Sequence, residues 1–144
     1  MADIGGIAGQ IARIREKANA LIEKELKNRG IKGIVPAHGS VLFFLLQQSK
    51  PVPIKAVVEN VRRVKSTVTV MINTLEKHGY VRKRPCETDN RIMYVELTPK
   101  GRRFRKDFDE ISQVLLNKLY KDMSKKDRKH LVEQLEKIEV NLSE

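Results

Sequence analysis

The chain lacks the residues on which several classes of protein depend. Its 144 residues include one cysteine, no tryptophan and only 5% aromatic residues. A single cysteine excludes a disulfide framework within the chain. The three histidines, at positions 38, 78 and 130, and Cys86 show none of the close spacings that metal sites use. We therefore expect a fold without disulfide bonds, and no metal or other cofactor.

Long apolar runs, a glycine-rich phosphate loop and a signal peptide are missing as well. A membrane span needs about 18 or more mostly apolar residues, so we expect a soluble, cytoplasmic protein. Acidic residues that could act in catalysis gather only in two places, typical of solvated helix faces. They are Asp107, Asp109 and Glu110, and Glu133 and Glu136. The sequence therefore predicts a protein that is not an enzyme.

Basic residues, by contrast, are plentiful. The 29 Lys and Arg residues outnumber the 18 Asp and Glu residues, which gives a net charge of +11. Between Val61 and Lys106 stand thirteen basic and four acidic residues, so a net +9 of this excess is local. Such a surface favours a polyanionic partner, although charge alone does not separate nucleic acid from an anionic membrane.

A helix is predicted from Lys65 to His78, within this basic region. Its apolar residues follow the i, i+3, i+4, i+7 spacing of an amphipathic helix: Val68, Met71, Ile72 and Leu75. Gly79 stands where a left-handed C-cap is usual. The opposite face carries short side chains that suit close approach to bases in a major groove: Ser66, Thr69, Val70 and Asn73. A Thr-rich surface helix without this function is the alternative.

Two strands are predicted after this helix, over Tyr80–Arg84 and Arg91–Leu97. The polar segment Pro85–Asn90 between them contains turn residues. In a winged helix-turn-helix, one helix occupies the major groove while a basic hairpin contacts backbone or minor groove. The helix and hairpin together predict this arrangement.

These segments resemble the MarR (multiple antibiotic resistance regulator) family of transcription factors. The resemblance is carried by Lys65–Thr69, Leu75–Val81, Asp89-Asn90-Arg91 and Leu97-Thr98-Pro99-Lys100-Gly101. The wing motif Asp-x-Arg is followed at the family's spacing by Leu-Thr-x-x-Gly. Asn90 replaces a usually basic residue, and Val70 stands where many members carry an Arg that reaches the DNA.

The residue pattern and the resemblance together predict a homodimeric, sequence-specific DNA-binding regulator, most simply a ligand-responsive repressor on a palindromic operator. Bases would be contacted by Thr67, Thr69, Val70 and Asn73, and phosphates by Lys65, Ser66, Arg82, Lys83 and Arg84. Arg91 would enter the minor groove, with Asp89 holding its guanidinium. The alternative is a winged-helix module that binds protein or structured RNA without base-specific readout.

Helices are predicted on both sides of this core. One spans residues 3–28, a second runs from Ser40 to about Gln48, and a short one begins with Pro53 and ends at Glu59. Ser49–Val52 is predicted as a turn. Thr98 and Pro99 begin a long helix to about Asp122, and Ser124 caps the last helix. The predicted fold class is mainly α with a small β-hairpin wing.

We expect a single domain, residues 1–144, with a winged helix-turn-helix core at 34–100. The helical regions 1–30 and 101–144 are expected to form the dimer. Their apolar stripes repeat every three to four residues: Ile4, Ile7, Ile11 and Ile14, and Leu131, Leu135, Ile138 and Leu142.

Two single residues leave alternatives open. His38 could cap its helix, fill space or line an effector pocket, and the first two roles are favoured. The resemblance implies such a pocket for small phenolic or lipophilic anions. Cys86 lies near Arg84 and could sense oxidants if the pKa of its thiol were lowered, but a bystander thiol is the favoured interpretation.

Overall fold

The structure is a computed structural model that describes residues 4–143. The chain divides into two compact units, one ending at Ile111 and one beginning at Ser112. The expectation of a single domain stays a prediction, and each unit is described by itself. None of the helices in the described residues is long and apolar enough to cross a membrane.

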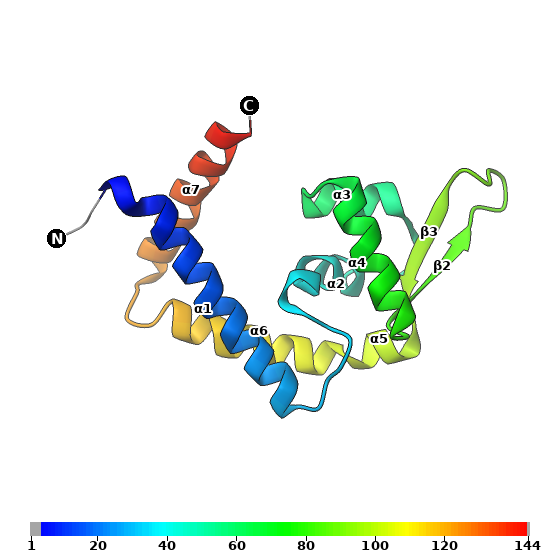
Figure 1. The fold of residues 1–144 in the computed structure, drawn as a ribbon, viewed down its shortest axis with the longest axis horizontal. Helices are drawn as coiled ribbons and strands as arrows, with labels where there is room; N and C mark the ends of the chain where they lie inside the picture. Colours follow the sequence, from blue (N-terminus) through cyan, green and yellow to red (C-terminus); the bar gives the residue numbers. More distant parts are fainter. Residues whose placement is uncertain (1–3, 144) are drawn as a thin grey trace. The chain divides into compact units, whose positions relative to one another are not determined.

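The first unit holds the predicted winged helix-turn-helix (Figure 1). Its elements are η1 (Ile4–Gly6), α1 (Ile7–Asn28), η2 (Pro36–His38), α2 (Gly39–Leu46), β1 (Val52–Pro53), α3 (Ile54–Val61), α4 (Lys65–Lys77), β2 (Val81–Pro85), β3 (Met93–Leu97), α5 (Pro99–Arg103) and the first part of α6 (Arg105–Leu119). The fold class predicted from the sequence, mainly α with a β-hairpin wing, is confirmed.

The core of this unit forms around α2, whose sequence is apolar on almost every side. The predicted stripe of α4 is buried against the same core, as is one face of the wing strands. The fully buried side chains are Leu42, Leu45, Ile72, Leu75, Val41, Val57, Val68, Val81 and Val95. Burying each such side chain stabilises the fold by roughly 1.5–3 kcal/mol. The core thus fixes α4 so that its polar face is outward.

The sheet has three antiparallel strands in the order β1-β3-β2. Val81 pairs with Leu97 and Arg82 with Glu96, while Val52 pairs with Val95. The sequence had predicted a turn where β1 lies, and this was wrong. A strand of two residues is too short to show alternation, and Pro53 is tolerated there because β1 lies at the edge of the sheet.

The junction between α4 and the wing is a Schellman motif. Gly79 has φ 82°, the left-handed conformation expected from the sequence. The N–H of Tyr80 donates to the carbonyl of Leu75 at 2.9 Å, and that of Gly79 to Glu76 at 2.9 Å. These bonds satisfy carbonyls at the helix end and set the direction in which β2 leaves α4.

Two helix predictions need correction. The long helix expected after Pro99 is two helices, α5 and α6, separated at Phe104. The N–H of Phe104 bonds to Gly101 at 3.2 Å, three residues back, so the chain tightens there before α6 begins. Pro53 is the extended N-cap residue of α3 and not its first helical residue, and α3 continues to Val61.

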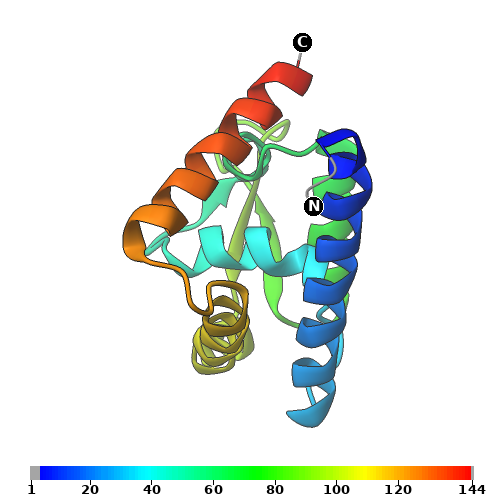
Figure 2. The ribbon, with the colours of Figure 1, turned by 90° about the vertical axis from the view of Figure 1, so that its left-hand side faces the viewer.

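The second unit contains the rest of α6 and the helix α7 (Lys125–Leu142), which is continuous (orange to red in Figure 2). Asp122 adopts φ 62° in the turn between them. The side chain of Ser124 accepts a hydrogen bond from the N–H of Asp127 at 3.1 Å, as expected for an N-cap. The predicted start of the last helix is therefore confirmed.

Candidate nucleic-acid interface

The turn between α3 and α4 brings the start of α4 to the surface. Arg62 forms this turn with φ 58°, a conformation that disfavours any residue with a Cβ. Val64, the N-cap residue of α4, provides no side-chain hydrogen bond to the helix. The first amides of α4 are therefore available to an anion, and the positive end of the helix dipole favours one there.

The outward face of α4 carries the side chains predicted to contact bases. Val70 is 64% exposed, and Ser66 and Asn73 are exposed as well. Thr67 and Thr69 are half-buried. The hydroxyl of Thr74 donates to the carbonyl of Val70 at 3.0 Å and is thus engaged within the helix. The face therefore combines one apolar contact surface with short polar groups, the mixture that base edges require.

A polar cluster of Asn73, Glu76 and Lys83 connects this face to β2. Nζ of Lys83 donates to Oδ1 of Asn73 at 2.7 Å and lies 3.4 Å from a carboxylate oxygen of Glu76. The backbone N–H of Lys83 also donates to Glu76, at 3.2 Å. These contacts connect the wing to α4 through side chains, in addition to the backbone connection between α4 and β2.

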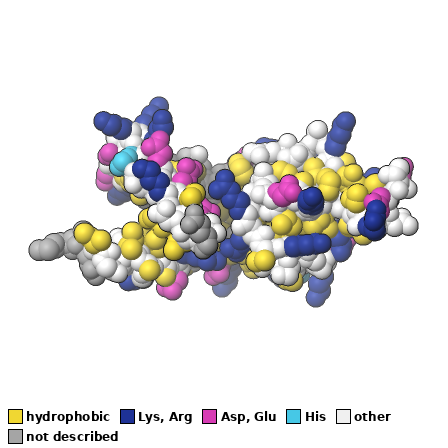
Figure 3. Space-filling model, turned by 90° about the horizontal axis from the view of Figure 1, so that it is seen from above, with side chains coloured by type: hydrophobic (Ala, Val, Ile, Leu, Met, Phe, Trp, Pro, Cys, Tyr) yellow, Lys and Arg dark blue, Asp and Glu magenta, His cyan; other side chains and the backbone are white. Residues whose placement is uncertain are grey.

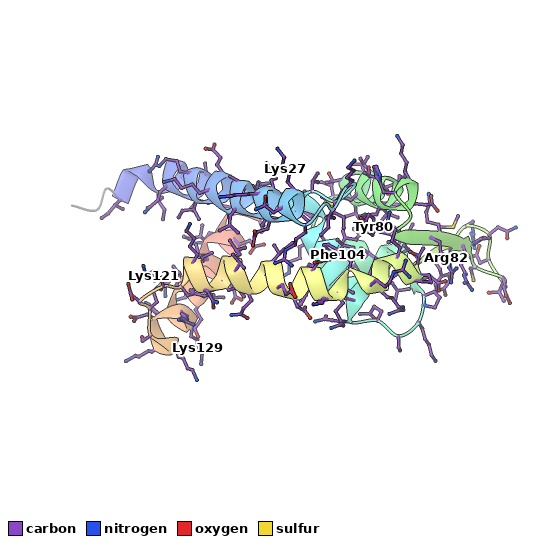
Figure 4. The ribbon with its side chains drawn as sticks, turned by 90° about the horizontal axis from the view of Figure 1, so that it is seen from below. Lys27, Tyr80, Arg82, Phe104, Lys121 and Lys129 are labelled. Carbon is purple, nitrogen blue, oxygen red and sulfur yellow. The ribbon has the colours of Figure 1, made fainter. Side chains whose placement is uncertain are left out.

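Arg82 and Arg84, both predicted to contact phosphates, share one carboxylate. Nε of Arg82 lies 2.5 Å and Nη2 of Arg84 2.7 Å from the same oxygen of Glu96. The hydrogen bond from Arg82 is the main reason why the pKa of Glu96 is lowered, and Arg84 adds to it. Glu96 was not singled out in the sequence, because only the strand register shows that it faces Arg82. Figure 4 labels Arg82 on the wing.

At the tip of the wing, Asp89 holds Arg91 by a bidentate ion pair. Nε and Nη2 of Arg91 each donate to one carboxylate oxygen of Asp89 at 3.0 Å. The backbone N–H of Arg91 donates to the same carboxylate at 3.0 Å. These hydrogen bonds lower the pKa of Asp89. The side chain of Arg91 is nevertheless 91% exposed, so its guanidinium is oriented and fully accessible.

This geometry matches that of known proteins. Residues 38–93 match the MarR family, a segment that contains α3, α4 and most of the wing. Over this segment, 56 of the 144 residues, the chain is similar to the MarR family.

A curated protein shows a similarity of the same kind. The HTH-type transcriptional regulator SarZ of Staphylococcus epidermidis is 26% identical over 98 residues. The match covers 68% of this chain and spans 65% of the length of SarZ.

Solved structures show the same fold. A MarR-like transcription regulator from Bacillus cereus superposes with a TM-score of 0.73 at 24% identity, covering 95% of this chain and 96% of that chain. A mutant of MarR from E. coli, complexed with operator DNA, gives a TM-score of 0.77 at 20% identity, covering 95% and 99%.

The MarR-family motif Leu-Thr-x-x-Gly has a physical reason in this chain. The hydroxyl of Thr98 donates to the carbonyl of Gly79 at 2.5 Å and accepts from the N–H of Gly101 at 3.1 Å. A Cβ on Gly101 would collide with the carbonyl oxygen of Tyr80. The motif therefore fastens the end of β3 and the start of α5 against the end of α4.

His38 and Tyr80 lie on the core side of this MarR-family fold. His38 is 4% exposed, and its Nδ1 accepts from the N–H of Val35 at 3.1 Å. Burial, and secondarily the charge of His78, lowers the pKa of His38. His38 is the N-cap residue of α2 but gives that helix no side-chain hydrogen bond, and its ring caps η2 instead. A pocket-lining role stays a prediction. Tyr80 stacks edge-on against Phe104, with ring centroids 6.1 Å apart (Figure 4).

Cys86 lies in the loop of the wing and is half-buried. Its Sγ lies 3.3 Å from the hydroxyl of Thr88, and hydrogen bonds from Thr88 lower the pKa of the thiol. Among the described residues, no group of three His, Cys, Asp or Glu side chains is placed to hold a metal ion.

The terminal stripes predicted to form the dimer lie open within their own units. Ile4 is 89% exposed and Ile11 40%, while on α7 Leu135 is 44% exposed. Ile7, Ile14, Leu131 and Leu142 are exposed too, and Ile138 is half-buried. In Figure 3, apolar side chains are visible along the N-terminal part of α1, and both apolar and basic side chains are visible over the winged region.

Proposed function

We propose that this protein is a transcription regulator that binds double-stranded DNA sequence-specifically, as a homodimer on a palindromic operator. One observation carries the proposal: α4 presents Ser66, Val70 and Asn73 outward, next to a wing whose accessible Arg91 is held by Asp89. A helix that docks on protein would expose large apolar residues in place of these small, mostly polar ones. The similar structure of the E. coli MarR mutant is a complex with operator DNA, which agrees with this proposal.

The contacts divide into two classes. Base readout comes from Thr67, Thr69, Val70 and Asn73, and phosphate contacts come from Lys65, Ser66, Arg82, Lys83 and Arg84. Arg91 enters the minor groove, where narrow A·T-rich segments attract a guanidinium. Arg82 and Arg84 exchange their shared partner Glu96 for phosphate oxygens when DNA binds.

The homodimer is supported by the uncovered stripes of α1 and α7. Exposed apolar patches of this kind usually mark interfaces. A two-fold axis would place two copies of α4 in successive major grooves, roughly 34–36 Å apart, which requires a palindromic site with half-sites about 10 bp apart. Acting on chromosomal DNA, the protein would work in the cytoplasm.

A gel-shift and selection experiment tests this function. Duplexes with a randomised central segment are selected on the wild-type protein in the presence of non-specific competitor DNA. We expect an enriched palindrome, and a gel shift with the DNA immediately upstream of the gene itself. A uniform set of selected sequences, bound only through charge and lost together as salt rises, would contradict base-specific readout.

We also propose that DNA binding responds to a small effector, with the chain acting as a repressor. The support is the similarity to the MarR family together with His38, a buried histidine at the end of η2. A panel of small phenolic and lipophilic carboxylic acids tests this idea by thermal shift and by release of labelled operator. Compounds that raise the melting temperature and release DNA support it, and a panel without effect on either measurement contradicts it.

A further inference from the structure

The outward face of α4 and the wing meet at the cluster of Asn73, Glu76 and Lys83. Nζ of Lys83 lies 2.7 Å from Oδ1 of Asn73 and 3.4 Å from Glu76. Asn73 is exposed, whereas the side chain of Lys83 is only 27% exposed. Lys83 is therefore held between two acceptors at the edge of the predicted base-reading surface.

This contact fixes the orientation of the Asn73 amide. An ammonium group can only donate, so the amide oxygen must face Lys83 and the amide NH2 must lie on the other side. No other described side chain forms a hydrogen bond with this NH2. Glu76 fixes Lys83 in turn, since its carboxylate is bonded to both the backbone and the side chain of Lys83. The group that Asn73 offers to DNA is consequently a donor.

Adenine and guanine differ in the groups that they present to a hydrogen-bond donor in the major groove. An asparagine that is free to rotate binds adenine with two bonds, accepting from N6 and donating to N7. The oxygen of Asn73 already accepts from Lys83. To donate to this oxygen as well, the amino group at N6 of adenine would have to lie next to the ammonium, and two donors would then face each other. Guanine presents two adjacent acceptors, N7 and O6, in the major groove.

We propose that Lys83 is a positioning residue that makes Asn73 select guanine over adenine. The inference rests on the proposed function, because it assigns specificity within the same DNA site. It gives Lys83 a role beyond a phosphate contact, since the same ammonium determines which base its neighbour binds.

Selection from randomised duplexes tests the assignment. Asn73→Ala first identifies the base pair that Asn73 contacts, as the position where preference is lost. We expect guanine there for the wild type and adenine for Lys83→Met, with the guanine-to-adenine ratio falling on the order of tenfold. Lys83→Arg keeps a donor and should retain guanine. Lys65→Met removes the same charge from the same surface and should weaken all sequences alike.

A second measurement uses only the wild-type protein, so it does not depend on how the variants fold. The selected guanine is replaced by 7-deazaguanine, which lacks the N7 acceptor, and affinity should fall about fivefold or more. Adenine at this position in the wild type, an unchanged preference in Lys83→Met, or full affinity for 7-deazaguanine would overturn the inference. Failure of the wild type to select any sequence would instead overturn the proposed function.

Discussion

The winged region and the terminal helices differ in how far their apolar side chains are covered by the rest of the chain. In the winged region the apolar side of α4 is covered within the chain, and several charged side chains of the wing are held by ion pairs, as Arg91 is by Asp89. On α1 and α7 the apolar stripes stay exposed within their own units. We propose that the DNA-reading surface is complete in one chain, whereas the apolar stripes of the terminal helices are covered only when a second chain binds.

The largest expected effect comes from the covered side of α4. Val68 is fully buried, and Val68→Asp would place an unpaired charge in the core. We expect a loss of several kcal/mol, enough to unfold most of the protein at 25 °C. Circular dichroism with urea titration measures it. Val70→Asp, two residues away on the outward face, is the control and should leave the urea midpoint nearly unchanged. Equal destabilisation by both variants would show that the orientation of α4 is wrong.

Substitutions in the exposed stripes of α1 and α7 should have a different effect: the chain should still fold, but it should no longer form a dimer. Ile11→Asp combined with Leu135→Asp should abolish the dimer, and with it specific DNA binding, although neither residue belongs to the proposed DNA surface. Sedimentation at micromolar concentration separates the two states. A mass near 16.6 kDa is that of one chain, so this value for the wild type would contradict the proposed dimer. Val70→Asp serves again as the control, because it should leave the sedimentation coefficient unchanged.

The sequence predicted most of the winged region because local signals there agree with one another. The stripe of α4, Gly79 at its end and Thr98 before α5 each have a short-range cause. Two features had no such signal. The strand β1 is too short for alternation to be visible, and the pairing of Glu96 with Arg82 depends on register across two strands.

The break at Phe104 escaped prediction for a related reason. The apolar spacing continues through it, so periodicity alone predicts one helix. In the candidate site, residue types could be predicted, but not their pairing: that Lys83 bonds to Asn73 follows only from the wing packing beside α4.

At the wing, Arg91→Ala should weaken operator binding by roughly 1–3 kcal/mol. The guanidinium is oriented by Asp89 before DNA arrives, so little order has to be gained on binding. Fluorescence anisotropy on duplexes with A·T-rich and G·C-rich flanks should show the larger loss on the A·T-rich ones. Arg102→Ala removes an equal charge from α5 and is the control. Equal losses of affinity in the two variants would mean that Arg91 contributes only its charge and makes no specific contact in the minor groove.

The turn before α4 offers a change in the opposite direction. Arg62 adopts φ 58°, and glycine reaches this conformation without a Cβ penalty. Arg62→Gly should therefore stabilise the winged region by about 1 kcal/mol, seen as a higher urea midpoint. Arg63→Gly, at the next residue, has no positive φ to relieve and should not stabilise. A lower midpoint for Arg62→Gly would mean that the arginine side chain stabilises the turn by more than its backbone conformation costs.

The smallest effect is expected from His38, a single titrating group inside the covered region. Burial lowers the pKa of His38 below the ordinary value of 6.5, so the folded state favours the neutral ring. Protonation would also remove the lone pair with which Nδ1 accepts from Val35. Below pH 6.5 the unfolded chain therefore binds more protons at this site than the folded chain does. The contribution of His38 to the unfolding free energy is present above that pH and is lost as pH falls from 6.5 through the lowered pKa.

The variant His38→Asn keeps an acceptor for Val35 but does not titrate. Its unfolding free energy, measured with urea between pH 7.5 and about 5, should therefore depend less on pH than that of the wild type. A slope unchanged in His38→Asn would place the titrating group elsewhere.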